Sequence, residues 1–173
     1  KQGRPLEEAL AAVPEPGRTA LAGHVTFQAL TLAERHDSKL DGASKLIFTT
    51  HEGLRLEAVI MRITSGRTSL CVSSQVGCAA GCAFCATGKL GLLRNLSTHE
   101  ILDQVVLTMQ LLRAEGRTLR NVVFMGMGEP LHNEKALYAA LDVLRDPRGF
   151  YLSERHLLVS TVGMAAAMER FVD

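Results

Sequence analysis

The sequence has no long hydrophobic run and no strong charge of one sign. No apolar stretch approaches the roughly 20 residues that a membrane-spanning helix needs, and the apolar segment 6–13 lacks the flanks of a signal peptide. The formal net charge is +1, so no overall electrostatic field indicates a nucleic acid or an anionic membrane as partner, although RNA binding is not excluded. The sequence therefore predicts a cytoplasmic protein with no membrane partner.

Cysteine is scarce and confined to one short stretch. The four cysteines of the 173-residue chain stand at positions 71, 78, 82 and 85. They are too tightly clustered for a disulfide framework that would hold the whole chain together. Clustered thiols in a cytosolic setting indicate metal or redox chemistry instead.

Length and composition allow one ordinary hydrophobic core, with 47% hydrophobic residues in 173. The chain begins at Lys1 rather than at a methionine and ends just after what reads as the opening turn of a helix, so we expect a piece of a longer protein. Helical spacing at 6–13 precedes a linker at 14–17, and residues 18–36 show a second, weaker helical pattern. We expect residues 1–44 to be the remnant of a helical N-terminal accessory region and residues 45–173 to be the N-terminal part of a catalytic domain.

The hydrophobic period changes at Lys45. The segments 45–50, 54–63 and 68–73 are β-rich and are separated by residues with turn chemistry, so they predict a small antiparallel meander. The stretch 75–91 is glycine-rich and has no sustained period. It therefore predicts a loop that can wrap around a buried cofactor.

Helix and strand patterns alternate after this loop. Ser97-Thr98-His99-Glu100 fits a capping box that opens a helix ending near Gly116. A strand at 121–126, a helix at 133–145 and a strand at 156–162 follow. With residues 70–73 as the first strand, these segments make two β-α-β units and predict an α/β fold with a parallel sheet.

Ligands of such sheets bind at the carboxyl ends of the strands. Three segments of this sequence fall there: the cysteine loop, the residues 126–130 and the pair Ser160-Thr161. We therefore expect them to lie together.

Cys78, Cys82 and Cys85 form a CxxxCxxC motif. A structural zinc site usually has two paired CxxC knuckles, and zinc here would need Cys71 or a distant histidine as a fourth ligand. Three thiolates in one loop can instead hold three irons of a cubane cluster and leave the fourth iron open. An open coordination position is typical of catalytic metal sites, so the spacing favours iron-sulfur over zinc.

This motif, with Phe84 before its last cysteine, resembles the signature of radical S-adenosylmethionine enzymes. The resemblance implies a [4Fe-4S] cluster on Cys78, Cys82 and Cys85, whose open iron chelates S-adenosyl-L-methionine. An electron from a donor such as flavodoxin or ferredoxin then cleaves that cofactor to a 5′-deoxyadenosyl radical. The implied fold is a partial (β/α) radical-SAM barrel, preceded by the meander and the helical N-terminal remnant, with its C-terminal part missing.

A second motif, Met125-Gly126-Met127-Gly128-Glu129-Pro130, lies at the end of a predicted strand. Glycine and proline end strands in any fold, but a carboxylate held at this edge can accept hydrogen bonds from an ammonium group. The motif is similar to the GGEP motif of radical enzymes, which contacts the methionine amino group, and Gly128 and Glu129 map onto it. Ser160, after the next strand, corresponds to a further cofactor contact, its alternative being an ordinary capping hydroxyl.

Three longer stretches, 71–78, 94–96 and 123–131, resemble the RlmN/Cfr family of ribosomal RNA adenine methyltransferases. The resemblance implies methylation of C2, with C8 as the alternative, of an adenosine in 23S ribosomal RNA, and transfer RNA as an additional candidate substrate. Both carbons are electrophilic and cannot attack a methyl sulfonium directly. The family therefore uses a radical route through a methylated cysteine.

The resemblance also assigns two catalytic residues. Cys71 matches the cysteine that resolves the thioether adduct, its alternative being a buried apolar strand residue. Glu57 matches the glutamate that removes a proton from the substrate carbon, with Glu52 as its competitor. The methyl-carrying cysteine should lie beyond Asp173, so we expect this chain to assemble the cluster and cleave the cofactor without methylating RNA.

Two other functions stay open. A radical S-adenosylmethionine enzyme with another substrate would keep the cluster and Glu129 but give Cys71 and Glu57 no role. A non-catalytic zinc-binding RNA module would hold zinc without iron or sulfide. Four basic residues are candidate phosphate neighbours or ordinary solvated surface: Lys89, Arg94, Arg117 and Arg120.

Overall fold

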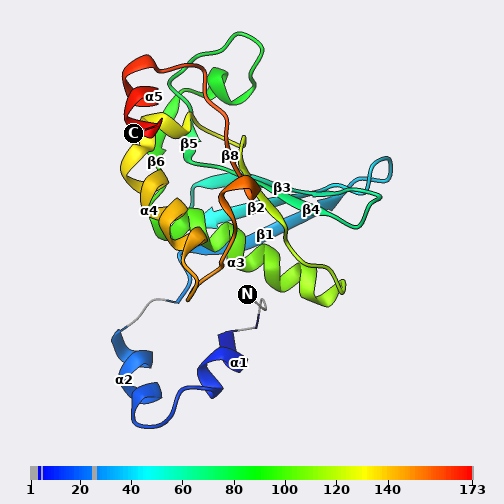
Figure 1. Cartoon of the computed structure of the whole chain (residues 1–173), viewed down its shortest axis with the longest axis vertical. Coiled ribbons are helices and arrows are strands. Elements are labelled where there is room, and N and C mark those ends of the chain that lie inside the picture. Colours follow the sequence, from blue (N-terminus) through cyan, green and yellow to red (C-terminus); the bar gives the residue numbers. More distant parts are fainter. Residues whose placement is uncertain (1–3, 5, 25–26, 173) are drawn as a thin grey trace.

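The computed structural model describes residues 4, 6–24 and 27–172 (Figure 1). In chain order, its elements are α1 (Leu6–Ala11), α2 (Gly17–His24), β1 (Leu30–Asp37), β2 (Ser44–Thr50), β3 (Arg55–Arg62), β4 (Thr68–Val72), β5 (Gln75–Gly77), η1 (Thr87–Leu90), β6 (Leu92–Asn95), α3 (Thr98–Ala114), β7 (Asn121–Phe124), η2 (Pro130–Asn133), α4 (Glu134–Arg145), η3 (Glu154–His156), β8 (Leu157–Val159) and α5 (Ala165–Val172). No described helix has the length and apolar character to cross a membrane.

A six-stranded mixed sheet in the order β1-β2-β3-β4-β7-β8 organises the structure. Its first four strands pair antiparallel, and β4, β7 and β8 pair parallel. The predicted meander and the two predicted β-α-β units are therefore confirmed. Strand β4 belongs to both, since it ends the meander and begins the parallel part.

Helices α3 and α4 cover one face of this sheet (Figure 1). Alternate residues of the strands point into this core, so that Leu56, Ala58 and Ile60 of β3 are buried while Glu57 and Val59 between them are half-buried. Helix α3 begins at the predicted capping box, with both hydrogen bonds between Ser97 and Glu100 present. The face that carries Glu57 is therefore the one turned away from the helices.

The prediction of a helix over residues 18–36 is wrong in its second half. Residues 17–24 form α2, but 30–37 form the edge strand β1, which pairs with β2 over its length, while 25–26 lie outside the described residues. Asp103 of α3 holds the start of this strand, because its carboxylate accepts hydrogen bonds from the amides of Ala29 (2.5 Å) and Leu30 (3.0 Å). These contacts between distant segments outweigh a weak local helical preference.

The stretch expected to be a loop at 75–91 begins as a strand. β5 pairs antiparallel with β6 and forms a two-stranded ribbon at the base of the cysteine loop. Strands of three and four residues are too short to show a period in the sequence. The division of the chain at residue 44 stays a prediction. Strand β1 lies before this boundary and pairs with β2, which begins at it, so the two predicted parts share one sheet.

Candidate cofactor and catalytic site

The carboxyl ends of the three parallel strands lie side by side, as predicted. The Gly126 amide donates to the Val72 carbonyl at the end of β4 (3.0 Å), and the Ser160 amide donates to the Phe124 carbonyl at the end of β7 (3.2 Å). The cysteine loop and the segments after β7 and β8 therefore start from one edge of the sheet. The Ser160 side chain is exposed there.

Glu129 connects two of these segments. Its side chain is 2% exposed, and its two carboxylate oxygens accept hydrogen bonds from the amides of Leu131 (3.0 Å) and Val162 (2.9 Å). The Val162 amide comes from the segment that also carries Ser160. The structure thus brings together Gly128, Glu129 and Ser160, the three predicted cofactor-binding residues.

Position 128 requires a glycine, because of its backbone conformation and its close contact with Gln75. Its φ of +101° lies in the region that favours glycine, and a Cβ atom at this position would lie 2.6 Å from Cβ of Gln75. The backbone after β7 therefore approaches β5 closely. This contact sets the Glu129 segment directly against the beginning of the cysteine loop.

The cysteine loop leaves the β5–β6 ribbon and returns to it (Figure 1, green, beyond β5 and β6). The Cys78 amide donates to the Gly91 carbonyl (2.9 Å), which closes the loop at its base. A Cβ atom at Gly77 would lie 1.9 Å from this carbonyl oxygen, so only glycine fits. At the far side, the Cys85 amide donates to the Cys82 carbonyl (3.0 Å) and forms a tight turn.

The loop offers thiols, the type of ligand that an iron-sulfur cluster takes. Backbone amides of Gly88 and Thr87 and the Thr87 hydroxyl lower the pKa of the Cys85 thiol and outweigh the opposing effect of burial. The Cys78 sulfur accepts a hydrogen bond from the Ala80 amide (3.4 Å). The lowered pKa of Cys85 favours its thiolate, the form of cysteine that binds metal.

Across the described ranges, no group of three or more His, Cys, Asp or Glu side chains is arranged to hold a metal ion. The assignment of Cys78, Cys82 and Cys85 as cluster ligands therefore stays a prediction that rests on their spacing and on the chemistry of the thiols.

Cys71 and Glu57 lie on the same face of the sheet. Cys71 of β4 pairs with Val59 of β3, and Glu57 is the next residue of β3 on that face, so the two residues are diagonal neighbours. Burial raises the pKa of the Cys71 thiol, while a hydrogen bond from the Met125 backbone opposes this shift. The contact with Met125 places Cys71 beside the segment that leads to Glu129.

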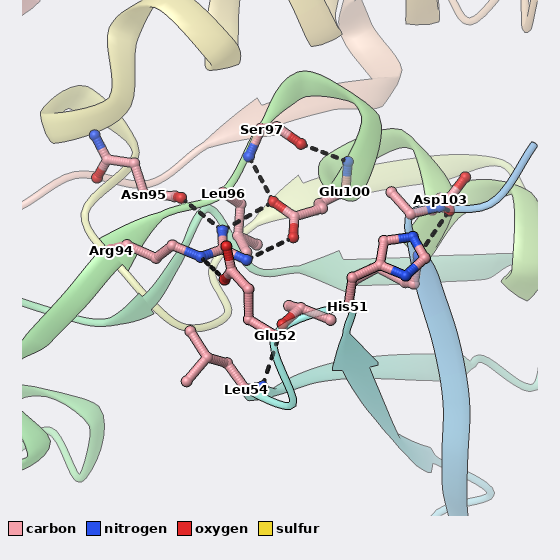
Figure 2. A network of polar contacts seen from close by, with 12 residues as sticks. His51, Glu52, Leu54, Arg94, Asn95, Leu96, Ser97, Glu100 and Asp103 are labelled. Atoms are coloured by element: carbon pink, nitrogen blue, oxygen red, sulfur yellow. Dashed lines mark hydrogen bonds and ion pairs between the residues drawn. The ribbon is translucent and has the colours of Figure 1, made fainter. Parts of the chain in front are cut away.

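Glu57 and its competitor Glu52 have different surroundings. The Glu57 carboxylate forms an ion pair with Lys45 of β2 (3.2 Å) and lines an open cavity of about 620 Å³, together with Leu90 of the cysteine loop and Met127. Glu52 lies in the turn between β2 and β3 and pairs with Arg94 (2.6 Å) (Figure 2). Glu52 also lines an open cavity, of about 440 Å³, but its lining comes from the β6 and α3 side rather than from the cysteine loop. The neighbourhood of Leu90 and Met127 therefore favours Glu57, which stays a prediction.

The chain is similar to RNA methyltransferases over most of its length. The chain is 55% identical over 150 residues to a probable RNA methyltransferase of Rhodopirellula baltica, covering 87% of this chain and 40% of that protein. It is 46% identical over 144 residues to dual-specificity RNA methyltransferase RlmN 1 of Myxococcus xanthus, covering 82% and 40%. The chain is a homologue of the RlmN-family radical S-adenosylmethionine RNA methyltransferases.

The fold agrees as well. The crystal structure of a radical SAM methyltransferase from Sphaerobacter thermophilus matches with a TM-score of 0.89 and 39% identity, over 95% of this chain and 48% of that one. No protein-family model matches the chain. The chain thus spans less than half the length of these relatives.

Arg94 connects the ribbon of this RlmN homologue to helix α3. Its guanidinium binds both carboxylate oxygens of Glu100 (2.8 and 3.0 Å) and donates to the Asn95 carbonyl (Figure 2). Arg94 was a candidate phosphate neighbour, but two carboxylates of the chain already hold it. Burial raises the pKa of Glu100, but hydrogen bonds from Arg94 and Ser97 outweigh it and hold the pKa below its usual value of 4.5.

We expect Glu100→Gln to lower the free energy of unfolding by about 1–3 kcal/mol at pH 7, because it removes a buried charged partner of Arg94. The Glu100 pKa is lower in the folded state than in the unfolded state. Its ionised form therefore stabilises the fold above the unfolded pKa, and this contribution is lost as the pH falls through the folded pKa. Urea unfolding at pH 7 and at several lower pH values measures the difference, which should shrink towards acid.

Glu154→Gln is the matched control. Glu154 also pairs with an arginine, Arg145 (2.7 Å), but its side chain is 79% exposed. Such a pair contributes little to stability. Equal losses in the two variants at pH 7 would contradict the account of Glu100.

Three buried polar residues of this site escaped the sequence analysis. Gln104 of α3 accepts from the Ser73 amide (2.8 Å) and donates to the Ser73 carbonyl (3.0 Å), and the Ser73 hydroxyl donates to the Glu57 carbonyl (2.5 Å). Gln75, the third, is fully buried between the cysteine loop and the Glu129 segment. The one available signal was the polar run Ser73-Ser74-Gln75 directly after an apolar strand.

Proposed function

We propose that the protein carrying this chain is a radical S-adenosylmethionine methyltransferase that methylates C2 of an adenosine in 23S ribosomal RNA. Transfer RNA is a second candidate substrate. The observation that carries the proposal is that Cys71, Glu129 and Ser160 lie at or just after the carboxyl ends of three neighbouring parallel strands. The CxxxCxxC loop starts from the same edge of the sheet. The proposed setting is cytoplasmic, with flavodoxin or ferredoxin as electron donor.

In this proposal Cys78, Cys82 and Cys85 hold a [4Fe-4S] cluster. When bound, the cluster and S-adenosylmethionine supply the radical that activates an otherwise unreactive methyl group. The protein supplies thiolates, and the amides around Cys85 favour that form. The proposed catalytic domain is the first part of a (β/α) barrel, with the face opposite α3 and α4 as its interior.

Gly128, Glu129 and Ser160 bind S-adenosylmethionine. The Glu129 carboxylate is held in place by two backbone amides, so it is oriented before the ammonium group of the cofactor arrives. Gly128 lets this segment lie against β5. The exposed Ser160 hydroxyl is available for a further contact.

Glu57 and Cys71 act on the substrate. Glu57 takes the proton from the substrate carbon, and it faces a cavity that the cofactor segments also line. Cys71 rests as a neutral thiol, since burial raises its pKa. To resolve the thioether, its sulfur would form a disulfide with the second cysteine as the C–S bond of that cysteine breaks. The electron pair of the broken bond and a proton would go to the carbon that becomes the new methyl group. All four cysteines of this chain have other proposed roles, so the methyl-carrying cysteine would lie outside this sequence.

Cys71→Ala tests this function in the full-length protein. We expect the variant to accumulate a covalent protein–RNA adduct that mass spectrometry detects, because the thioether forms but is not resolved. The double variant Cys71→Ala/Cys82→Ala should give no adduct, because it lacks one cluster ligand. Wild-type levels of methylated adenosine without any adduct in Cys71→Ala would show that Cys71 does not resolve the thioether. Absence of both the adduct and methylated adenosine, in the wild type as well, would indicate a radical enzyme with another substrate.

A further inference from the structure

We propose that Gln75, together with Asn95, is a positioning residue that couples the cysteine loop to the cofactor-binding carboxylate Glu129. The inference rests on the proposed function, because it assumes that the loop holds a cluster and that Glu129 binds S-adenosylmethionine. Neither amide side chain needs to touch the cofactor. Their role is to fix the distance between its two binding segments.

Gln75 lies in the first position of β5 and is 0% exposed. Its Oε1 accepts a hydrogen bond from the Glu129 amide (2.8 Å), and its Nε2 donates to Oδ1 of Asn95 in β6 (2.6 Å). The backbone N–H of Gln75 also donates to the Met127 carbonyl (3.1 Å). One buried side chain thus contacts the Glu129 segment on one side and the returning strand of the cysteine loop on the other.

These contacts belong to a closed ring. Asn95 Nδ2 donates to the His132 carbonyl (3.3 Å), and the His132 amide donates to the Glu129 carbonyl (3.0 Å). The ring therefore runs from Glu129 to Gln75, to Asn95, to His132 and back to Glu129. The side-chain amides of Gln75 and Asn95 each accept at oxygen and donate at nitrogen, an arrangement in which consecutive hydrogen bonds strengthen one another.

The ring needs an amide at position 75. The Glu129 N–H fixes Oε1 as the acceptor, so Nε2 must be the donor to Asn95. A carboxylate could not donate, and an aliphatic side chain could neither accept nor donate. Close packing of Gly128 against Gln75 restricts the side chain to this position.

The experiment compares full-length wild type, Gln75→Leu, Asn95→Leu and the double variant after anaerobic reconstitution. Iron and sulfide content, the Kd for S-adenosylmethionine by equilibrium dialysis, and the melting temperature are measured for each. We expect wild-type iron and sulfide in all of them, and a Kd raised about tenfold in each single variant. The double variant should be no weaker than the singles, because both substitutions open the same ring.

Asn121→Leu is the matched control. Asn121 also makes two side-chain hydrogen bonds, to Ser69 (2.9 Å) and His156 (2.8 Å), but at the amino end of β7. It should lower the melting temperature without changing the Kd. Asn95 is exposed, so its variant carries the test if Gln75→Leu does not fold.

A wild-type Kd in Gln75→Leu or Asn95→Leu would overturn the inference, and so would independent, multiplying effects in the double variant. Failure of the wild type to bind S-adenosylmethionine would overturn the proposed function and the inference with it. The two failures are therefore distinguishable.

Discussion

Replacing Cys82 with alanine is expected to lower the iron content of the reconstituted protein from about four atoms per chain to a small fraction of that. Cys82 is half-buried in a loop outside the sheet, and its carbonyl rather than its sulfur makes the turn with Cys85. The fold should therefore persist while the cluster is lost. Iron and sulfide assays after anaerobic reconstitution, with circular dichroism as the check on folding, measure this.

Cys71→Ala is the control for this loss. Cys71 lies in β4, and the proposed function gives it no role in the cluster, so the variant should retain wild-type iron. Equal iron loss in both variants would instead indicate that Cys71 is a ligand. Full iron content in Cys82→Ala would contradict the assignment of the loop.

Gly128→Ala should have the second large effect. The new methyl group would lie 2.6 Å from Cβ of Gln75, and the residue would have to keep a φ of +101°. Together, overpacking and backbone strain should lower the free energy of unfolding by about 2–5 kcal/mol. Because the Glu129 segment must move, binding of S-adenosylmethionine should also be lost.

Gly66→Ala separates the two causes. Gly66 has a φ of +83°, but a Cβ atom there would meet nothing within 4 Å. This variant should lose only about 1–2 kcal/mol, the backbone cost alone. Denaturant unfolding of both variants gives the comparison, and equal losses would show that the contact with Gln75 carries no weight.

Local patterns in the sequence predicted much of the fold. The capping box at Ser97 and Glu100 marks the start of α3 because it depends on four consecutive residues. The meander and the β-α-β units were also predictable, because the hydrophobic repeat continues along the whole of each strand or helix. Strand β1 was missed because its pairing with β2 and its contact with Asp103 join distant segments.

The candidate site divides in the same way. Motif spacing predicted the cluster cysteines, and the resemblance to a known motif predicted the Gly128-Glu129 pair; both stay predictions. Sequence gave no sign that Gln75 and Asn95 form a ring with Glu129, or that Arg94 is held by Glu52 and Glu100, because these contacts depend on how separate segments fold together.

The proposed function depends on a [4Fe-4S] cluster in the cysteine loop that binds S-adenosylmethionine. Electron paramagnetic resonance of the anaerobically reconstituted, reduced protein, with and without S-adenosylmethionine, tests it most directly. We predict a [4Fe-4S] signal that changes when the cofactor is added. A folded protein that carries zinc and gives no such signal would contradict the claim and favour a zinc-binding RNA module.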